Sequence, residues 1–267
     1  MANLDVSLLK EFAVGVTVRA GFILRRNFND YLKSKPKHKT RHEIVCASDM
    51  EVHKFVRYKV RKRFPNHNFV SEEGDEVDNN ARYTWVVDPL DGTLNYTIGN
   101  PFFCTSLTLL DQGKPVIGVL HAPLLREIFI VEKNKSARLN ERNIHVSKER
   151  SLKNSVLSFS YYSRDKKSRA KSMELWSHFE DSSRAMRHLG CTTLELAYIA
   201  CGRMEAAVIV PPLRLWDIAN GILLIETAGG KITDFSGQEW NSCSQGLVAT
   251  NGLVHRQILN ILKKHSR

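Results

Sequence analysis

The 267-residue sequence predicts a layered protein of mixed α and β structure, with two lobes in one chain. Three observations predict this fold class. An amphipathic helical pattern opens the chain, short β-branched and aromatic runs follow between residues 68 and 132, and helices alternate with strands after about residue 150. Because no repeat or low-complexity linker separates these parts, we expect an N-terminal α+β lobe over 1–150 and a C-terminal α/β lobe over 151–267.

Two helices are expected at the start of the N-terminal lobe. Apolar side chains between Leu8 and Phe28 recur at steps of three and four, which is the period of an amphipathic helix. A second helix is expected to begin at Ser48, a plausible N-cap residue. It should end before Pro65, because proline lacks the backbone N–H that a helix interior needs.

The rest of the N-terminal lobe is expected to be β structure. Runs rich in β-branched and aromatic residues, typical of strands, occupy residues 68–71, 83–88, 104–110, 116–121 and 127–132. Between the third and fourth runs, the string Asp111-Gln112-Gly113-Lys114 is typical of a hairpin turn. We therefore expect the strands on either side of it to form a hairpin.

The C-terminal lobe is expected to alternate strands and helices. Strands are predicted at 156–160, 206–210 and 231–235, and helices at 168–179, 194–201, 217–228 and 254–264. The third of these helices should end at Gly229-Gly230, since glycine is the usual residue just beyond a helix.

The composition is that of a globular protein. The apolar set AVILMFWYC makes up 42% of the chain and DEKR 25%, so a sizeable core can form. No apolar run approaches the roughly 18 residues of a membrane span, and residues 1–10 lack a signal-peptide pattern, so we expect a cytoplasmic protein. The five cysteines include no C-x-x-C pair, which favours neither a disulfide framework nor a cysteine zinc site.

The net charge of +11 is unevenly distributed. Residues 1–63 carry 15 basic and 6 acidic side chains, residues 64–132 carry 3 and 10, and residues 133–171 carry 12 and 3. The cations Lys33, Lys35, Lys37, Lys39 and Arg41 occupy alternate positions, which an extended backbone would place on one face. Such a stripe could attract an anionic substrate, with a solvated loop as the alternative.

The segment Asp88-Pro89-Leu90-Asp91-Gly92-Thr93 carries the strongest chemical signal. A buried strand delivers Asp88, and two carboxylates three positions apart at the end of an apolar strand favour a hard divalent metal. The backbone N–H groups of Gly92 and Thr93 would favour an anion such as phosphate beside it. A plain turn is the alternative, but it would require neither the Trp-Val-Val before this segment nor the Asn-Tyr after it.

Residues 85–96 and 216–230 resemble the two signatures of the inositol monophosphatase family. This family belongs to a superfamily of magnesium-dependent, lithium-sensitive phosphatases that includes fructose-1,6-bisphosphatase. Residues 47–49, the Glu72-Glu73 pair, residues 187–200 and residues 247–251 fall in the family's order and spacing. The resemblance implies an α-β-α-β-α sandwich, a homodimer, and a Mg²⁺-dependent phosphomonoester hydrolase with two to three ions in each active site.

The resemblance also implies roles for individual residues. Asp88 would bridge two Mg²⁺ ions, with Glu72 and the Leu90 carbonyl on the first and Asp91 and Asp217 on the second. Glu72 would also help to hold a weaker third ion. The catalytic group would be Asp49, Glu72 and Thr93, with Thr93 orienting or deprotonating the attacking water and no covalent intermediate formed. Substrate contacts would come from Gly92, Thr93, Gly190, Cys191, Thr192, Arg214 and Asp217.

Several of these residues have simpler interpretations. Ser48 and Asp49 could cap a helix, which would not prevent Asp49 from reaching a neighbouring hydroxyl. Glu72 and Glu73 could lie in a solvated loop, and Asp217 suits a helix N-terminus on dipole grounds alone. Cys191 could be core packing or a pocket wall, and the segment Leu194-Glu195-Leu196 is interpreted as ordinary helix core.

Three departures from the family pattern affect the expected substrate. Val210 stands where many inositol monophosphatases carry an acidic residue that binds inositol hydroxyls. Arg214, three residues before Asp217, would suit a second phosphate or a carboxylate, with a solvent-facing or ion-paired arginine as the alternative. A basic segment over 133–140 replaces the usual glycine-rich turn.

Three functions are therefore weighed. The first is hydrolysis of inositol monophosphate, fructose-1,6-bisphosphate or both. The second is a 3′-phosphoadenosine-type nucleotide phosphatase, which Arg214 and the basic segments would favour. The third is RNA or transcription-complex binding through the basic segments 33–63 and 133–171, where Tyr58, Tyr161 and Tyr162 could stack on bases.

Overall fold

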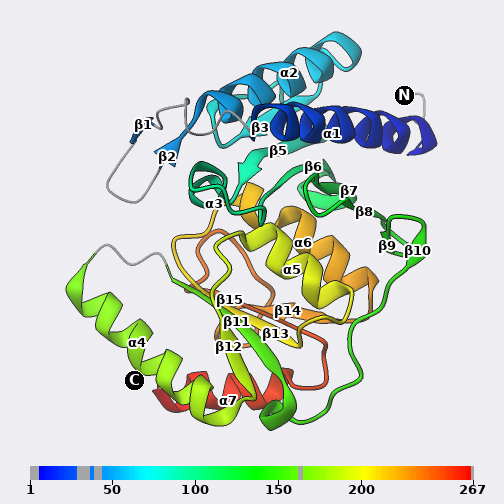
Figure 1. The fold of residues 1–267 in the computed structure, drawn as a ribbon. Coiled ribbons are helices and arrows are strands. Elements are labelled where there is room, and N and C mark those ends of the chain that lie inside the picture. Colours follow the sequence, from blue (N-terminus) through cyan, green and yellow to red (C-terminus); the bar gives the residue numbers. More distant parts are fainter. Residues whose placement is uncertain (1–5, 29–36, 39–43, 162–164, 266–267) are drawn as a thin grey trace.

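The computed structural model describes residues 6–28, 37–38, 44–161 and 165–265. Its helices and sheets form five layers (Figure 1). Helices α1 (Val6–Phe28) and α2 (Ala47–Arg63) cover an eight-stranded sheet on one outer side. Helices α5 (Thr192–Ala200) and α6 (Leu215–Thr227) separate it from a five-stranded sheet. Helices α4 (Lys166–Ser182) and α7 (His255–His265) cover the far side of that second sheet, which confirms the expected α-β-α-β-α order.

The first helix forms as its periodicity predicts. The buried residues Leu9, Ala13, Val16, Ala20 and Leu24 of α1 are spaced three and four apart and pack on the eight-stranded sheet. The opposite face is exposed. Burial of this apolar stripe against the sheet holds α1 in place, because a helix in water gains little stability from propensity alone.

The second helix begins one residue earlier than expected, and Ser48 is not its N-cap. The N-cap is Cys46, whose backbone N–H donates to the Asp49 carboxylate over 2.8 Å. Asp49 is the third residue of the helix, and its carboxylate reaches back to accept this backbone N–H, which has no partner within the helix. The Ser48 hydroxyl instead lies 3.1 Å from the Tyr96 hydroxyl, which itself donates to the Leu24 carbonyl.

The eight-stranded sheet contains all five strands that were predicted for the N-terminal lobe. Its order is β10-β9-β8-β7-β6-β5-β3-β4, and only β3 and β5 are parallel neighbours. The strands are β3 (Asn68–Ser71), β4 (Gly74–Val77), β5 (Tyr83–Asp91), β6 (Cys104–Asp111), β7 (Lys114–Ala122), β8 (Glu127–Glu132), β9 (Arg138–Leu139) and β10 (Arg142–Asn143). Gln112 and Gly113 both have positive φ between β6 and β7, which confirms the predicted hairpin turn.

The five-stranded sheet belongs to the second half of the chain. Its order is β12-β11-β13-β15-β14, with β11 parallel to both neighbours and β15 antiparallel to both of its own. The strands are β11 (Val156–Tyr161), β12 (Ala185–Arg187), β13 (Ala206–Val210), β14 (Lys231–Thr233) and β15 (Leu247–Thr250). Strand β14 ends at Thr233, two residues early, because the Asp234 carboxylate accepts the Ser236 and Gln238 N–H groups in a turn.

The remaining elements are short or peripheral. They are α3 (Thr93–Thr97), α4 (Lys166–Ser182), α7 (His255–His265), the 3₁₀ turn η1 (Leu152–Asn154), and a two-stranded ribbon of β1 (Lys37–His38) and β2 (Ile44–Val45). Of the predicted basic stripe, only the backbone of Lys37 lies within the described residues, and Lys33, Lys35, Lys39 and Arg41 lie outside them. Tyr162 lies outside them as well.

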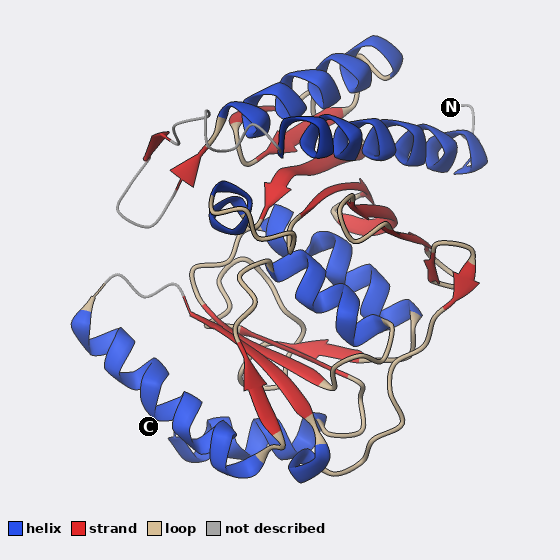
Figure 2. Cartoon of the chain, viewed as in Figure 1, coloured by secondary structure: helices blue, strands red, loops and turns tan. Residues whose placement is uncertain are grey.

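One apolar core joins the two halves of the chain. Helices α5 and α6 are buried between the sheets, and their apolar residues pack against both Phe129 of β8 and Ile209 of β13. The strands of the eight-stranded sheet precede residue 150 in the sequence, and those of the five-stranded sheet follow it. The division of the chain into two lobes at residue 150 stays a prediction. Figure 2 shows the same layering by element type. Among the described helices, none is both long enough and apolar enough to cross a bilayer.

Candidate active site

A bulge at the end of β5 brings Asp88 and Asp91 to the same side of the strand. Asp88 pairs with Ser106 and Asp91 pairs with Cys104, so an advance of three residues along β5 matches an advance of two residues along β6. Strand β5 therefore contains one extra residue here. Side chains three positions apart on a regular strand would point to opposite faces, and the extra residue cancels this alternation. Pro89 stands inside the irregularity, where its missing N–H costs no ladder hydrogen bond. The strand therefore continues past Asp88, where the sequence predicted its end.

Asp88 is the centre of a group of carboxylates. Its side chain is 1% exposed, and the Leu90 N–H donates to it over 3.1 Å. Burial, together with the charges of Glu72, Asp91 and Asp217, raises the pKa of Asp88 well above its ordinary value. Because these carboxylates repel one another, they are costly to ionise without a cation between them.

Asp217 joins this group from the first turn of α6. Its carboxylate accepts the Arg214 backbone N–H over 2.8 Å, as expected of an acid near a helix N-terminus. Burial raises the pKa of Asp217 to about 7, and the charge of Asp91 acts in the same direction. The charge of the exposed Arg214 guanidinium acts in the opposite direction and lowers the pKa of Asp217.

The first turn of α5 connects Asp91 to Asp217. The Thr193 N–H donates to the Asp91 carboxylate over 2.5 Å, and the Thr193 hydroxyl donates to the Asp217 carbonyl over 3.1 Å. Burial raises the pKa of Asp91, and the Thr193 hydrogen bond opposes that rise. The sequence alone did not indicate a role for Thr193, although this residue directly follows the predicted Cys191 and Thr192.

Asp49 caps α2 and binds Thr93 at the same time. One carboxylate oxygen accepts the Cys46 N–H, and the other lies 3.2 Å from the Thr93 hydroxyl oxygen. Asp49 therefore makes the contact expected of a helix cap and also reaches the Thr93 hydroxyl, and its catalytic role stays a prediction. The Thr93 hydroxyl also lies 2.9 Å from the Leu90 carbonyl oxygen, and its single proton can be donated fully to only one of the two acceptors.

The two glutamates of the β3–β4 turn act on different neighbours. The charge of Glu72 raises the pKa of Asp88, and the charge of Glu73 raises that of Asp49. Burial is the larger cause for both aspartates and brings the pKa of Asp49 to about 6. The charge of Glu72 therefore acts on Asp88 and that of Glu73 on Asp49, and the assignment of Glu72 as a metal ligand stays a prediction.

Gly92 allows β5 and α3 to join beside the carboxylates. It has a φ of +86°, and a Cβ atom there would lie 3.0 Å from the Phe102 carbonyl oxygen and 3.2 Å from Cys191 Cβ. A side chain would be strained by the backbone conformation and crowded by these neighbours. Glycine is therefore required for the close approach of this turn to α5.

Glu195 corrects the interpretation of its segment as ordinary helix core. Its fully buried carboxylate accepts the Leu189 and Gly190 N–H groups, each over 2.9 Å. It also accepts hydrogen bonds from the hydroxyls of Ser158 and Ser160 on β11. Burial raises the pKa of Glu195. The available signal was one acidic residue in an otherwise apolar helix, which can be buried only if its oxygens are satisfied.

Asn95 holds the same loop from the other side. Its side-chain amide donates to the Leu189 carbonyl over 2.7 Å and to the Phe102 carbonyl over 2.8 Å. Gly190, with a φ of +74°, therefore lies in a segment fixed by Glu195 and by Asn95. The sequence motif contains Asn95, but the motif alone did not indicate this role.

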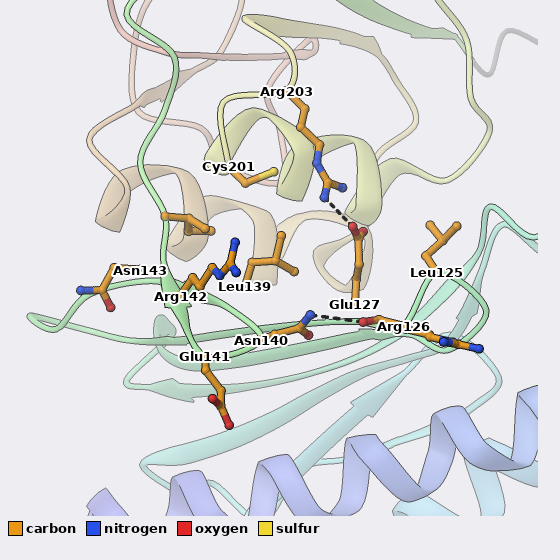
Figure 3. A pocket seen from close by; sticks show the side chains of 11 residues that line it. Leu125, Arg126, Glu127, Leu139, Asn140, Glu141, Arg142, Asn143, Cys201 and Arg203 are labelled. Carbon is orange, nitrogen blue, oxygen red and sulfur yellow. Dashed lines mark hydrogen bonds and ion pairs between the residues drawn. The ribbon is translucent and has the colours of Figure 1, made fainter.

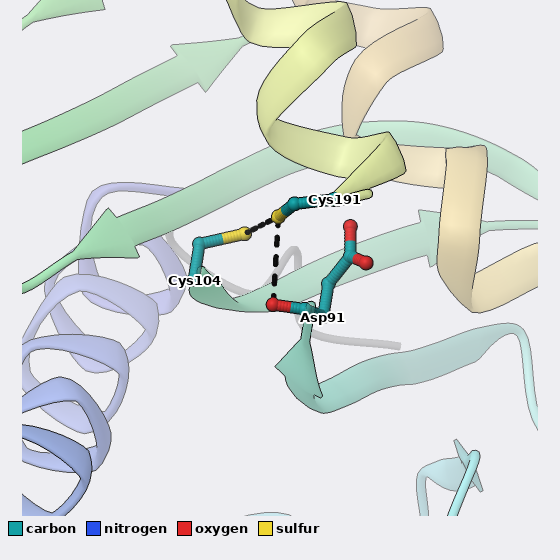
Figure 4. A group of neighbouring side chains, drawn as sticks. All are labelled: Asp91, Cys104 and Cys191. Atoms are coloured by element: carbon teal, nitrogen blue, oxygen red, sulfur yellow. Dashed lines mark hydrogen bonds between the residues drawn. The ribbon is translucent and has the colours of Figure 1, made fainter. Parts of the chain in front are cut away.

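Cys191 and Thr192 begin α5 at the junction of the two sheets. Cys191 is the N-cap of the helix, and Thr192 is its buried first residue. The Cys191 sulfur lies 3.7 Å from the Cys104 sulfur and donates to the Asp91 carbonyl over 3.4 Å (Figure 4). Burial raises the pKa of Cys191 well above its ordinary value, which disfavours the thiolate that a nucleophile needs and favours the interpretation of Cys191 as packing or a pocket wall.

A separate pocket of about 770 Å³ lies away from these carboxylates (Figure 3). It is lined by the β8–β10 region and by residues just after α5, including Arg126, Arg142 and Arg203. Arg203 is paired with Glu127 across it. None of the predicted site residues lines this pocket, so it is not the candidate active site.

The acidic cluster suits hard divalent cations. Carboxylates and a backbone carbonyl are the oxygen donors that such ions prefer, and a cation would relieve the repulsion that raises the pKa of Asp88. The residues that could hold it are Glu72, Asp88, Asp91, Asp217 and, through its carbonyl, Leu90. A cluster of this kind on this layered fold is typical of metal-dependent hydrolases of phosphate esters.

Comparisons with known proteins identify the family. The model of the inositol monophosphatase family matches residues 5–267, and the chain belongs to this family of metal-dependent phosphatases. It is a phosphoric monoester hydrolase.

Individual relatives agree with this assignment. The chain is similar to fructose-1,6-bisphosphatase/inositol-1-monophosphatase of Thermotoga maritima, at 32% identity over 95% of each chain. It is also 32% identical to the Nus factor SuhB of Xylella fastidiosa, over 85% of this chain and 83% of that protein. The crystal structure of the extragenic suppressor protein suhB from Bartonella henselae superimposes with a TM-score of 0.92 at 29% identity, covering 96% of this chain and 99% of the other.

Proposed function

We propose that the chain hydrolyses small phosphate monoesters with two to three Mg²⁺ ions held by Glu72, Asp88, Asp91, Asp217 and the Leu90 carbonyl. The observation that carries this proposal is the group of carboxylates around the buried Asp88. Burial, and then the charges of Glu72, Asp91 and Asp217, raise the pKa of Asp88, and a bound divalent cation would favour its ionised form. Bound there, the ions would neutralise phosphate charge and acidify a water molecule. The Leu90 carbonyl can serve as a ligand when the Thr93 proton is directed to Asp49 instead.

Thr93 and Asp49 are the proposed water-positioning pair. With the Thr93 hydroxyl donating to Asp49, the lone pairs of its oxygen are free to accept a hydrogen bond from the attacking water. A proton taken from that water would be balanced by transfer of the Thr93 proton to the Asp49 carboxylate. Asp49 holds the orientation of this hydroxyl from a rigid helix end. The water attacks phosphorus directly, so no covalent enzyme intermediate is formed, and Glu72 completes the proposed catalytic group.

The proposed substrate contacts belong to the same candidate active site. They are made by the backbone or the side chains of Gly92, Thr93, Gly190, Cys191, Thr192, Arg214 and Asp217. The loop at Gly190 is supported by the buried Glu195, which fixes its N–H groups, so the alcohol part of a substrate would meet a rigid surface.

We infer that inositol monophosphate, fructose-1,6-bisphosphate or both are substrates. The name of the Thermotoga maritima relative contains both activities, and this supports the inference. Val210 offers no acceptor for inositol hydroxyls, and the exposed Arg214 guanidinium beside Asp217 suits a second phosphate. These two features favour the bisphosphate.

The direct test is phosphate release from inositol-1-phosphate, fructose-1,6-bisphosphate and 3′-phosphoadenosine-5′-phosphate by wild type and Arg214→Ala. Loss of a charge-assisted hydrogen bond should lower kcat/KM for the bisphosphate about 10–100-fold. Inositol-1-phosphate should be affected much less. Equal losses on both would remove the role of Arg214, and preference for the adenosine substrate would instead select the nucleotide phosphatase alternative.

A second candidate function is binding of RNA or a transcription complex. On the exposed face of α2, Tyr58 is 59% exposed, and the Lys59 and Lys62 ammonium groups lie 5.9 and 5.8 Å from its ring centre. An aromatic ring among cations suits a nucleic-acid base next to a phosphate. The relative named Nus factor SuhB adds support from its name.

This candidate is tested by the fluorescence anisotropy of a labelled single-stranded RNA at increasing salt concentration. Affinity should fall steeply with salt and should be weaker for Tyr58→Ala/Lys62→Ala. Absence of binding at low salt would exclude the role.

Two further proposals concern the state of the protein in the cell. A homodimer is proposed from the family resemblance, and light scattering of the purified protein tests it. A cytoplasmic location is proposed because all five cysteines are unpaired, as expected in a reducing compartment.

A further inference from the structure

The outer helix layer carries a cluster of nitrogen and oxygen donors that the proposed reaction does not use. Glu174 and His178 are four residues apart on α4, so both side chains project from the same face of that helix. His265 is the last residue of α7, which packs beside α4. In Figure 1, these helices lie beyond the five-stranded sheet, in the outer layer of the fold.

The three side chains lie close together. One ligand atom from each of Glu174, His178 and His265 lies within 4.8 Å of the others. Around a tetrahedral ion with bonds of about 2.0–2.2 Å, neighbouring ligand atoms are roughly 3.4 Å apart. The His178 and His265 rings are stacked with centroids 3.5 Å apart and planes inclined by 25°. Because a bound ion lies in the plane of each imidazole that holds it, the two rings must turn out of this stack to share one ion.

The donor set selects the class of ion. Imidazole nitrogens suit Zn²⁺, Cu²⁺ and Ni²⁺, whereas Mg²⁺ prefers oxygen ligands throughout. A neutral imidazole keeps a lone pair on one ring nitrogen, and this lone pair is the donor that such an ion binds.

We propose that Glu174, His178 and His265 form a transition-metal site, best suited to Zn²⁺, that fastens the end of α7 to α4. The apolar residues Ile258 and Leu262 of α7 are buried against the sheet, but the helix ends one turn after Leu262 in a run of exposed lysines. A metal ion held by both helices stabilises this end of the fold. The site is independent of the acidic cluster and needs no substrate.

The test is Zn²⁺ titration by calorimetry and thermal unfolding of the full chain in excess Mg²⁺, which occupies the oxygen sites. Wild type should bind one more Zn²⁺ than His178→Ala/His265→Ala, and Zn²⁺ should raise the Tm of wild type only. Glu174→Gln should weaken binding by at least the roughly 10–100-fold that loss of even an outer-shell partner costs. The exposed His145→Ala variant is the matched control and should bind Zn²⁺ as wild type does.

The two histidine substitutions are near the surface, so the Zn²⁺-free variants should melt within a few degrees of wild type, which makes the comparison interpretable. Phosphate release should be unchanged in them, and this separates the result from any failure of the proposed hydrolase function. The same Zn²⁺ stoichiometry and Tm increase in the double variant as in wild type would overturn the site. Absence of Zn²⁺ binding in the micromolar range by wild type would overturn it as well.

Discussion

At the residue scale, the candidate chemistry depends on where a single hydroxyl proton is directed. The Thr93 hydroxyl lies within hydrogen-bond distance of both Asp49 and the Leu90 carbonyl. Directing the proton to Asp49 leaves the carbonyl for a cation and the Thr93 oxygen for water. Asp49 itself is fixed by the Cys46 N–H, so its capping role supports its proposed catalytic role.

Replacement of Thr93 by valine tests this arrangement. Thr93→Val keeps the shape of the side chain but removes the hydroxyl, and kcat should fall by about 10²–10⁴, the usual contribution of a general base. Thr93→Ser, which keeps the hydroxyl, should retain most of the activity. Steady-state phosphate release measures both variants, and a Thr93→Val enzyme with nearly wild-type kcat would disprove the role.

The sequence could identify the carboxylates of the site but not their supporting contacts. Asp88 and Asp91 were predictable because proline and glycine beside two acids at the end of an apolar strand indicate a local irregularity. Asp217 was predictable only through the resemblance to the family. Glu195 and Thr193 were missed, because their importance comes from loops and strands that are distant in sequence.

At the element scale, the first turn of α5 links the two halves of the molecule. Thr193 contacts Asp91 and Asp217, while Glu195 in the same turn holds the Gly190 loop. A helix end is suited to this task because its backbone N–H groups are free to bind carboxylates. The alignment of β5, α5 and α6 therefore determines the geometry of the acidic cluster.

Glu195→Ala is the substitution that tests the support of the Gly190 loop. Both loop N–H groups donate to one carboxylate oxygen, Oε1, and the Ser158 and Ser160 hydroxyls donate to Oε2, so a glutamine could keep every contact. Glu195→Ala leaves both N–H groups without this acceptor, at a cost of about 1–3 kcal/mol each in the free energy of unfolding, and KM should rise more than kcat falls. Steady-state kinetics and urea unfolding measure the two effects, with the exposed Glu180→Ala as the control.

The opposite pattern would argue against a positioning role for Glu195. If kcat fell with KM unchanged, or if only stability changed, Glu195 would be no more than a part of the core.

Long elements were predicted well and short ones were not. The helices and strands with strong apolar periodicity were found to within a few residues, whereas β4, β9, β10 and β12 were missed. Strand β4, with the sequence Gly-Asp-Glu-Val, lies at the edge of its sheet, and its polar residues carry no strand pattern. Strands of two or three residues form because neighbouring strands offer hydrogen bonds, which a local pattern does not reveal.

At the scale of the whole molecule, the acidic cluster should make stability depend on both pH and metal. The folded-state pKa values of Asp217 and Asp49, about 7 and 6, lie above the ordinary value of 3.8. A carboxyl group with a raised folded-state pKa binds more protons when folded, so its contribution to stability is lost as pH rises through that pKa.

The Tm of the protein in EDTA should therefore fall between pH 5 and pH 8 more than that of Asp217→Asn, which lacks this ionisation. Mg²⁺ should raise the Tm of wild type more at pH 8 than at pH 5. Calorimetric scans with and without Mg²⁺ measure this, and subtraction of the variant removes contributions from other groups such as His255. An equal or larger effect of Mg²⁺ at pH 5 would contradict the proposed ligand set.

The most direct test of the central claim is phosphate release by wild type and Asp88→Asn, each with Mg²⁺ and with EDTA. The substitution nearly preserves side-chain volume but removes the charge at the centre of the carboxylate group, so circular dichroism should show a folded protein. We predict release by wild type that requires Mg²⁺ and stops in EDTA, and no turnover by Asp88→Asn. Substantial activity in folded Asp88→Asn, or undiminished release by wild type in EDTA, would contradict the account.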